Sequence, residues 1–173
     1  MRNIAFLFLC EAFSRTGSIV VLSSMALVGR ELAPHAALAT LPLALAPVTT
    51  MLVTVPAARL MQRRGRKVGF ALGAVLGMVG GLVGCAALFN EHFALLCVGA
   101  VGIGAVNGFS TYYRFAAAEV VDESRRSRAI SLVMAGGIVA AVAGSNLASW
   151  SRVLFPEHLF AGSYLAIAGI QVL

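Results

Sequence analysis

Charged residues are scarce in this sequence. Lys, Arg, Asp and Glu make up 12% of its 173 residues, whereas soluble domains carry roughly a quarter. Hydrophobic residues make up 60%, and the mean hydropathy is +0.91. This composition excludes an ordinary soluble domain. Several apolar runs reach the length of about 18 residues that is needed to cross the hydrocarbon core of a bilayer. We therefore predict an all-α polytopic membrane protein.

The residues that mark other function classes are also few. The three cysteines fall inside apolar segments, without the spacing of a metal site or a disulfide framework. The three histidines fall in short polar connections, so none is available as a base at membrane depth. The glycines between positions 99 and 108 do not match a nucleotide-binding fingerprint. We predict no enzyme, no metal, no cofactor and no nucleic-acid partner.

Long apolar runs dominate what is present. They predict one transmembrane domain with helices at about 4–29, 36–58, 68–89, 93–119, 129–150 and 159–173. The last run has only about 15 residues, short of a comfortable span of roughly 20, so we expect a truncated sixth helix. Prolines in the second run predict a bent or irregular helix; they are Pro42, Pro47 and Pro56.

Small residues recur every fourth position in two of these runs. Such ladders let neighbouring helix backbones approach closely, and we predict helix packing as their role. They comprise Gly69, Gly73, Gly77 and Gly81 in the third run, with Gly80 and Gly84 beside them, and Gly136, Ala140, Gly144 and Ala148 in the fifth.

Basic residues concentrate on one side of the predicted topology. With the N-terminus inside, nine of the thirteen are cytoplasmic: Arg2, five within 59–67 and three within 125–128. Only Arg30 and Arg152 fall in external turns. Cytoplasmic connections of membrane proteins carry an excess of Lys and Arg. We therefore expect a plasma-membrane protein, of the bacterial inner-membrane type, with a cytoplasmic N-terminus.

One of these basic segments resembles a family motif. Residues 58–67 read ARLMQRRGRK and are similar to the loop between helices two and three of the major facilitator superfamily, G-x-L-x-D-R-x-G-R-[RK]. Ala58 stands for the first glycine of the motif and Gln62 for its aspartate. The matching positions are Leu60, Arg63, Gly65, Arg66 and Lys67. Residues 118–129 resemble that family's loop between helices four and five. The segment from Gly137 to Gly144 resembles its antiporter motif, with Ser145 in place of proline.

The resemblance implies the N-terminal six-helix half, a three-plus-three inverted repeat, of a twelve-helix secondary transporter. Such a protein moves a small solute by alternating access, and we expect proton coupling and a second six-helix half as partner. The resemblance also implies a conformational latch in which Arg66 pairs with Glu119, beside Gln62, Arg63 and Gly65. The loss of the aspartate at Gln62 removes one acceptor from this network. Alternatively, these arginines serve only as topology determinants.

Polar residues within the spans suggest where transport chemistry would occur, because charges there usually face a cavity or a partner. Glu11 and Arg15 share a stripe of the first helix with Ser14 and Ser18. The fourth helix carries a similar stripe: Asn107, Ser110, Thr111 and Arg114. At 1.5 Å per residue, Glu11 lies roughly 10 Å and Arg114 roughly 7 Å from the cytoplasmic end.

We therefore hypothesise that Glu11, Arg15 and Arg114 cluster on the translocation pathway, with Glu11 as proton acceptor. The arginines would hold Glu11 ionised or bind an anionic substrate. A static interhelical ion pair is an equal alternative. Tyr112 and Tyr113 fit substrate contacts or interfacial anchors equally well. At the level of the whole chain, the alternative to transport is a six-helix membrane protein that acts as a scaffold or regulatory partner.

Overall fold

The computed structural model describes residues 2–151 and 160–170, which are helical with short connections and contain no strand. The elements in chain order are α1 (Arg2–Leu32), η1 (Ala36–Leu38), α2 (Leu41–Arg64), α3 (Arg66–Phe89), α4 (Phe93–Ser110), α5 (Tyr113–Glu119), η2 (Glu123–Arg125), α6 (Arg126–Ser151) and α7 (Ala161–Ile170). Five helical stretches of the described residues are long and apolar enough to cross a membrane. The predicted all-α membrane fold class is confirmed.

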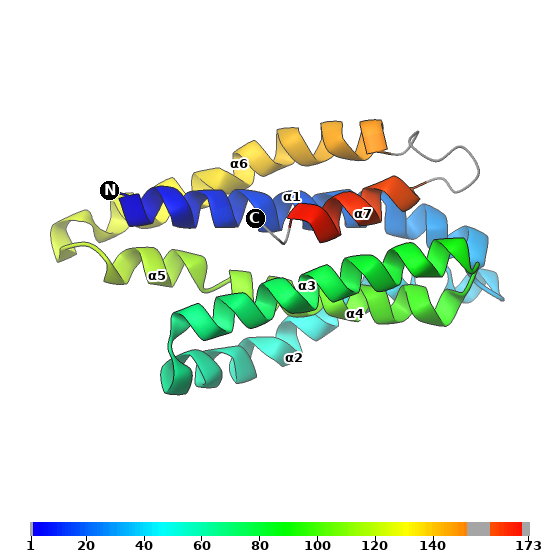
Figure 1. Cartoon of the computed structure of the whole chain (residues 1–173), viewed down its shortest axis with the longest axis horizontal. Coiled ribbons are helices and arrows are strands. Elements are labelled where there is room, and N and C mark those ends of the chain that lie inside the picture. Colours follow the sequence, from blue (N-terminus) through cyan, green and yellow to red (C-terminus); the bar gives the residue numbers. More distant parts are fainter. Residues whose placement is uncertain (1, 152–159, 171–173) are drawn as a thin grey trace.

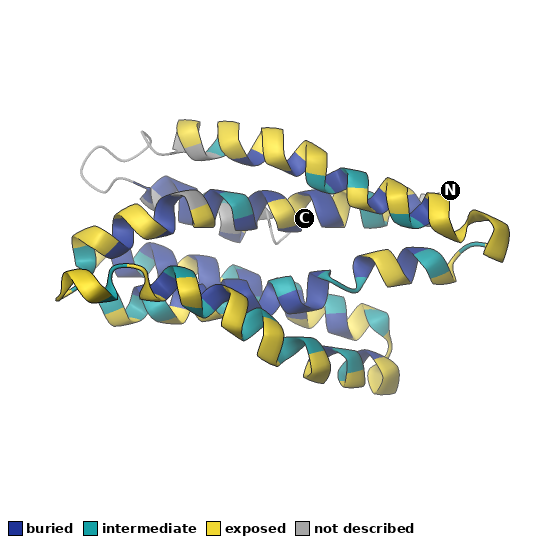
Figure 2. Ribbon diagram, turned by 180° about the vertical axis from the view of Figure 1, so that it is seen from behind, coloured by how far each residue is buried: buried dark blue, intermediate teal, exposed yellow. Residues whose placement is uncertain are grey.

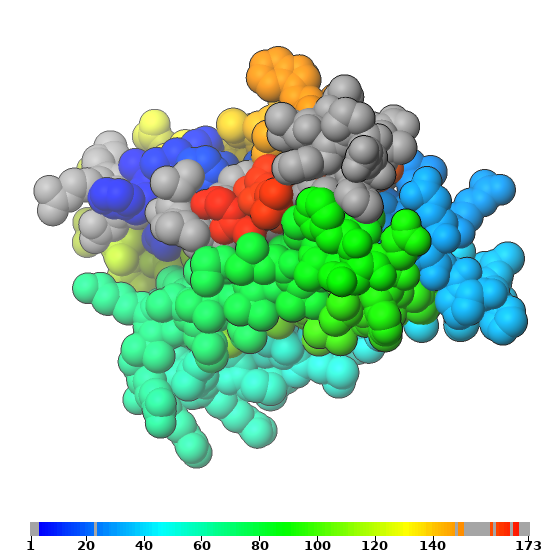
Figure 3. Space-filling model, turned by 45° about the vertical axis from the view of Figure 1, so that its right-hand side comes forward, coloured from blue at the N-terminus to red at the C-terminus, as the bar shows by residue number. Residues whose placement is uncertain are grey.

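The helices run roughly along one common axis (Figure 1). The most extensive contacts join α1 to α6, α3 to α4 and α2 to α4, and α7 lies between α1 and α3 (Figure 3). The N-terminus, the α2–α3 junction and the α5–α6 connection lie at one end of the bundle, whereas the α1–α2 and α3–α4 connections lie at the other (Figure 1). The segments in which basic residues concentrate therefore share one end.

Glycines allow the closest helix contacts. A Cβ atom on Gly102 of α4 would lie 2.6 Å from the Cα of Gly80 on α3, and one on Gly80 would lie 2.9 Å from the Cα of Gly102. Gly136 brings α6 onto α1 in the same way, because a Cβ there would lie 2.8 Å from the carbonyl oxygen of Phe8. The predicted packing role is thus confirmed for Gly80 and Gly136, whereas Gly102 lies outside the predicted ladders.

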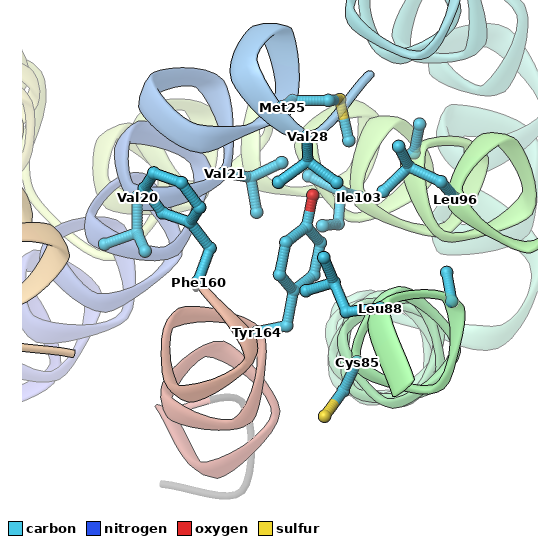
Figure 4. Packing of buried hydrophobic residues seen from close by; sticks show 12 residues of the cluster. Val20, Val21, Met25, Val28, Cys85, Leu88, Leu96, Ile103, Phe160 and Tyr164 are labelled. Carbon is cyan, nitrogen blue, oxygen red and sulfur yellow. The ribbon is translucent and has the colours of Figure 1, made fainter. Parts of the chain in front are cut away.

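Helix α7 is anchored by an aromatic side chain. The ring of Tyr164 lies among residues of α1, α3 and α4, which include Met25, Leu88 and Ile103 (Figure 4). Gly84 leaves room for this ring, because a Cβ there would lie 2.3 Å from its Cδ1 atom. The predicted sixth helix, 159–173, is described only for its α7 portion.

Helix α2 differs from the prediction. It begins at Leu41, five residues later than predicted, after the short η1 helix, and Pro42 occupies its first turn. Proline is favoured there because the missing N–H would have no partner in the helix. Pro47 and Pro56 lie inside the helix, which nevertheless continues to Arg64. All three prolines thus lie in α2, Pro42 at its start, and the helix is unbroken at the other two.

The predicted fourth helix, 93–119, is divided into α4 and α5 at Thr111 and Tyr112. The Tyr112 N–H donates to the carbonyl oxygen of Phe109 at 3.1 Å, three residues back instead of four. The Ser110 and Thr111 hydroxyls both donate to the carbonyl oxygen of Asn107, at 3.1 and 3.0 Å. Hydroxyl groups that bond the preceding turn compete with the regular helix ladder, and two of them do so here at the break.

The outer faces of α2 and α6 are largely exposed (Figure 2), and many of their exposed residues are large and apolar. Met51 is 79% exposed and Ile138 is 72% exposed, and Leu52, Val142 and Trp150 behave similarly. Contiguous apolar surface of this kind is expected to face lipid or another apolar surface.

We expect Gly102→Ala to destabilise the bundle by about 1–3 kcal/mol, the usual cost of overpacking, because its methyl group meets backbone that cannot move aside cheaply. Gly137→Ala is the matched control: it also lies inside a helix, but its Cβ would meet nothing within 4 Å. Alanine exceeds glycine in helix propensity by roughly 1 kcal/mol, so this control should be neutral or stabilising. Thermal unfolding in detergent measures both. Equal midpoints for the two variants would contradict the packing described.

Candidate functional site

A single glycine connects α2 to α3. Gly65 has φ 87° and ψ 157°, and its N–H donates to the carbonyl oxygen of Met61 at 3.0 Å. This backbone conformation is essentially restricted to glycine. The flanking basic residues consequently lie on the last turn of α2 and the first turn of α3. The predicted loop at 59–67 is therefore wrong in extent, because one residue with positive φ suffices to reverse the chain.

Arg66 and Glu119 form a bidentate ion pair between the start of α3 and the end of α5. Arg66 Nε donates to Glu119 Oε2 at 2.7 Å, and Nη2 donates to Oε1. Arg66 Nη1 also reaches the carbonyl oxygen of Tyr112 at 3.5 Å. The contact implied by the family resemblance is thus present, and its role as a latch stays a prediction. Because the Glu119 side chain is 63% exposed, its contribution to stability is expected to be modest.

The other residues predicted for the latch take no part in this ion pair. Gln62 lines a cavity of about 340 Å³ together with Arg66, Tyr112 and Glu119, but its side chain makes no hydrogen bond within the described part of the chain. Arg63 is exposed and likewise has no ion pair there. Gln62 therefore does not replace the missing carboxylate.

Tyr112 joins this region in a way that the sequence did not indicate. Its hydroxyl donates to the carbonyl oxygen of Thr54 on α2 at 2.9 Å, and its own carbonyl oxygen accepts from Arg66. Tyr113, in contrast, is buried against Phe70, with ring centroids 4.5 Å apart. Tyr112 thus connects the break between α4 and α5 to both α2 and α3.

A second cavity, of about 240 Å³, lies where α1, α4, α5 and α6 meet. The side chains that line it are Glu11, Arg15, Ser110, Thr111, Arg114 and Met134. The structure therefore places five of the six residues predicted for the translocation pathway around one cavity. The sixth, Asn107, lies one turn away and accepts a hydrogen bond from the Ser18 hydroxyl at 2.6 Å, which joins α1 to α4.

Glu11 is the most unusual group in this cavity. Its side chain is only 10% exposed, and Arg15 Nε donates to its Oε1 atom at 2.9 Å. Its Oε2 atom is buried and has no hydrogen-bond partner among the residues that the structure describes, and the same holds for the nearby Ser14 hydroxyl. A buried acceptor left unpaired costs free energy.

Arg114 borders the cavity without joining the ion pair. Its guanidinium carbon lies 4.9 Å from the centroid of the Phe115 ring, and no ion pair joins Arg114 to Glu11 in residues 2–151 and 160–170. The Glu11–Arg15 pair lies within α1, one turn apart. The structure thus shows an intrahelical pair where the sequence suggested a pair between helices, and Arg114 lines the same cavity. Whether the pair is static or takes part in transport stays a prediction.

Comparison with known proteins gives one family and two relatives. The chain matches the Major Facilitator Superfamily over residues 4–170. It is 37% identical to the riboflavin transporter RfnT of Brucella anthropi over 172 residues, which cover 99% of this chain and 43% of that protein. It is 28% identical to the uncharacterized MFS-type transporter YdeG of Bacillus subtilis over 147 residues, which cover 84% of this chain and 34% of that protein. The chain thus spans less than half of either relative, and no solved structure matches it.

A double-mutant cycle tests the Arg66–Glu119 pair. We expect Arg66→Ala and Glu119→Ala to show a coupling free energy of about 0.5–1 kcal/mol, the upper range for exposed pairs, because the contact is bidentate. Thermal unfolding of the two single variants and the double variant supplies the values.

The Arg126–Glu123 pair is the matched control, since it is longer, at 3.7 Å, and more exposed. Its coupling should be close to zero. Equal coupling in the two cycles would mean that the Arg66–Glu119 geometry adds nothing to stability.

Proposed function

The chain belongs to the major facilitator superfamily, and on this premise we propose that it is the N-terminal six-helix half of a secondary active transporter that moves a small solute by alternating access. Both relatives are named as transporters. The five long apolar helical stretches among the described residues support a role within the membrane. No enzymatic step is part of this proposal.

A second six-helix half completes the pathway in this proposal. The exposed apolar faces of α2 and α6 support it, because they offer surface that a further set of helices would cover. The share of each relative that the chain covers supports it as well. We further propose that the end of the bundle with the N-terminus and the α2–α3 junction is cytoplasmic, on the strength of the nine basic residues assigned to that side.

The observation that carries the coupling proposal is the unpartnered Oε2 atom of Glu11. Protonation would convert this atom from an acceptor into a donor. In this proposal Glu11 is the carboxylate that takes up and releases the coupled proton. In this proposal Arg15 orients Glu11 by donating to its Oε1 atom, and Arg114 lines the same cavity from α5.

Helix α5 would link this cavity to the cytoplasmic end. It carries Arg114, which borders the cavity, and Glu119, which pairs with Arg66. The break at Thr111 and Tyr112 separates α5 from α4, so α5 is positioned to move as a unit. We propose that the Arg66–Glu119 pair biases the two-state equilibrium between inward-open and outward-open forms.

We propose riboflavin as the first substrate to test, because the relative named for it is similar over nearly the whole chain. Riboflavin carries no net charge near neutral pH. An uncharged substrate does not need the arginines as an anion-binding site, which agrees with the assignment of Arg15 to Glu11.

We expect Glu11→Gln to abolish proton-driven uptake and to flatten its pH dependence, because the amide cannot exchange a proton. Arg114→Ala should lower uptake and keep the pH dependence. The assay is uptake into proteoliposomes that contain the natural protein carrying this chain, under an imposed proton gradient. Glu31→Gln, an exposed change at the other end of the same helix, should leave uptake unchanged. Wild-type uptake and pH dependence in both Glu11→Gln and Arg114→Ala would overturn the coupling role.

The same proteoliposomes should accumulate labelled riboflavin, and excess unlabelled riboflavin should compete with the label. If the protein takes up other solutes but not riboflavin, riboflavin is ruled out as its substrate and the proposed transporter function stands. A folded, inserted protein that moves none of a broad solute panel would instead favour the scaffold or regulatory function.

A further inference from the structure

A third cavity lies at the same end of the bundle as the α2–α3 junction, between the start of α1 and the α5–α6 connection. Its volume is about 370 Å³, and its lining residues are Ile4, Val121, Arg125, Arg128, Ala129 and Leu132. It shares no residue with the cavity at Glu11 or the cavity at Gln62. Neither proposed coupling nor the proposed latch accounts for it.

Two arginines supply the charge of this cavity. Arg125 ends η2 and Arg128 lies in the first turn of α6, so the two are three residues apart. Both are exposed, and neither belongs to an ion pair in the described ranges, whereas the intervening Arg126 contacts Glu123. Arg125 also borders a neighbouring hollow with Asp122 and Glu119, but the Glu119 carboxylate is engaged by Arg66.

The rest of the cavity wall is apolar. Ile4 and Ala129 are buried in a small cluster that joins α1 to α6, and Val121 packs against that cluster. Leu132 is half exposed, one turn of α6 beyond Arg128. A small hydrated anion gains nothing from such a wall, and an apolar molecule gains nothing from two arginines. The combination suits an amphiphile with an anionic head and an apolar tail.

We propose that this cavity binds an anionic phospholipid of the cytoplasmic leaflet, with the phosphate between Arg125 and Arg128 and an acyl chain against Leu132 and Ile4. The assignment to that leaflet rests on the proposed orientation of the bundle. Basic pockets between transmembrane helices on the cytoplasmic side are suited to anionic headgroups, and each arginine near the surface adds to the attraction. The bidentate geometry of guanidinium groups favours phosphate oxygens in particular.

Native mass spectrometry of the whole chain in detergent measures this binding directly. The chain is titrated with dioleoyl phosphatidylglycerol and, separately, with dioleoyl phosphatidylcholine, which has the same tails and no net charge. We expect a preference for phosphatidylglycerol, and a loss of roughly tenfold in its affinity when Arg125→Gln and Arg128→Gln are combined.

The matched control combines Arg59→Gln with Arg64→Gln. These residues are exposed, lie at the same end of the bundle and line none of the three cavities. The control removes the same charge and should keep the preference for phosphatidylglycerol. An equal loss in both double variants would overturn the site, because the attraction would then reflect overall charge. Circular dichroism of both variants, matched to wild type, verifies that each is folded.

Two further experiments distinguish binding of a lipid from binding of a free anion. Leu132→Asn should weaken phosphatidylglycerol binding while both arginines remain, and inorganic phosphate in excess should displace little of the lipid. If phosphate displaces the lipid completely and Leu132→Asn has no effect, the cavity is a plain anion site and the lipid proposal fails. Transport activity enters none of these measurements, so their failure leaves the proposed transporter function untouched.

Discussion

Membrane helices gain no hydrophobic free energy by packing against one another, because lipid tails are as apolar as leucine. Close contact must therefore come from small residues, and in this chain it comes from glycine. Gly80 and Gly102 bring α3 against α4, and Gly136 brings α6 against α1. These contacts fix the positions of four helices. The cavity at Glu11 occurs where α1, α4, α5 and α6 meet and polar side chains interrupt the close packing.

Polar groups in that cavity are connected unequally. Ser18 and Asn107 form a hydrogen bond that joins α1 to α4. Glu11 has one oxygen bonded to Arg15 and one that finds no partner in the described part of the chain. The first arrangement is what stability alone would favour. The arrangement at Glu11 leaves an acceptor beside a cavity. The cavity lies at the helix break, and α5 runs from that break to the Arg66–Glu119 pair. This arrangement connects the fold to the proposed function.

Much of this organisation could be predicted from sequence. Long apolar runs, glycine spacing and the distribution of arginine indicated the helices, their packing and a shared basic end, because each pattern follows from how single helices meet a bilayer. The pairing of Arg66 with Glu119 followed from the family resemblance. Three features could not be predicted: the single-residue junction at Gly65, the break at Thr111 and the contacts of Tyr112. They depend on backbone angles and on carbonyl oxygens that no residue pattern encodes. The role of Tyr164 depends on the space left by Gly84, which likewise arises only in the folded bundle.

If the cavity between α1 and α5 belongs to the proposed translocation pathway, it must open to water. Cysteine accessibility tests it most directly, with Thr111→Cys compared with Val75→Cys after the three natural cysteines are replaced by serine. Val75 lies on the exposed apolar face of α3 at a comparable distance from the end of the bundle that holds the α2–α3 junction. We expect a water-soluble thiosulfonate to modify Thr111→Cys in native membranes and to leave Val75→Cys unmodified. Equal modification of both positions, or of neither, would contradict it.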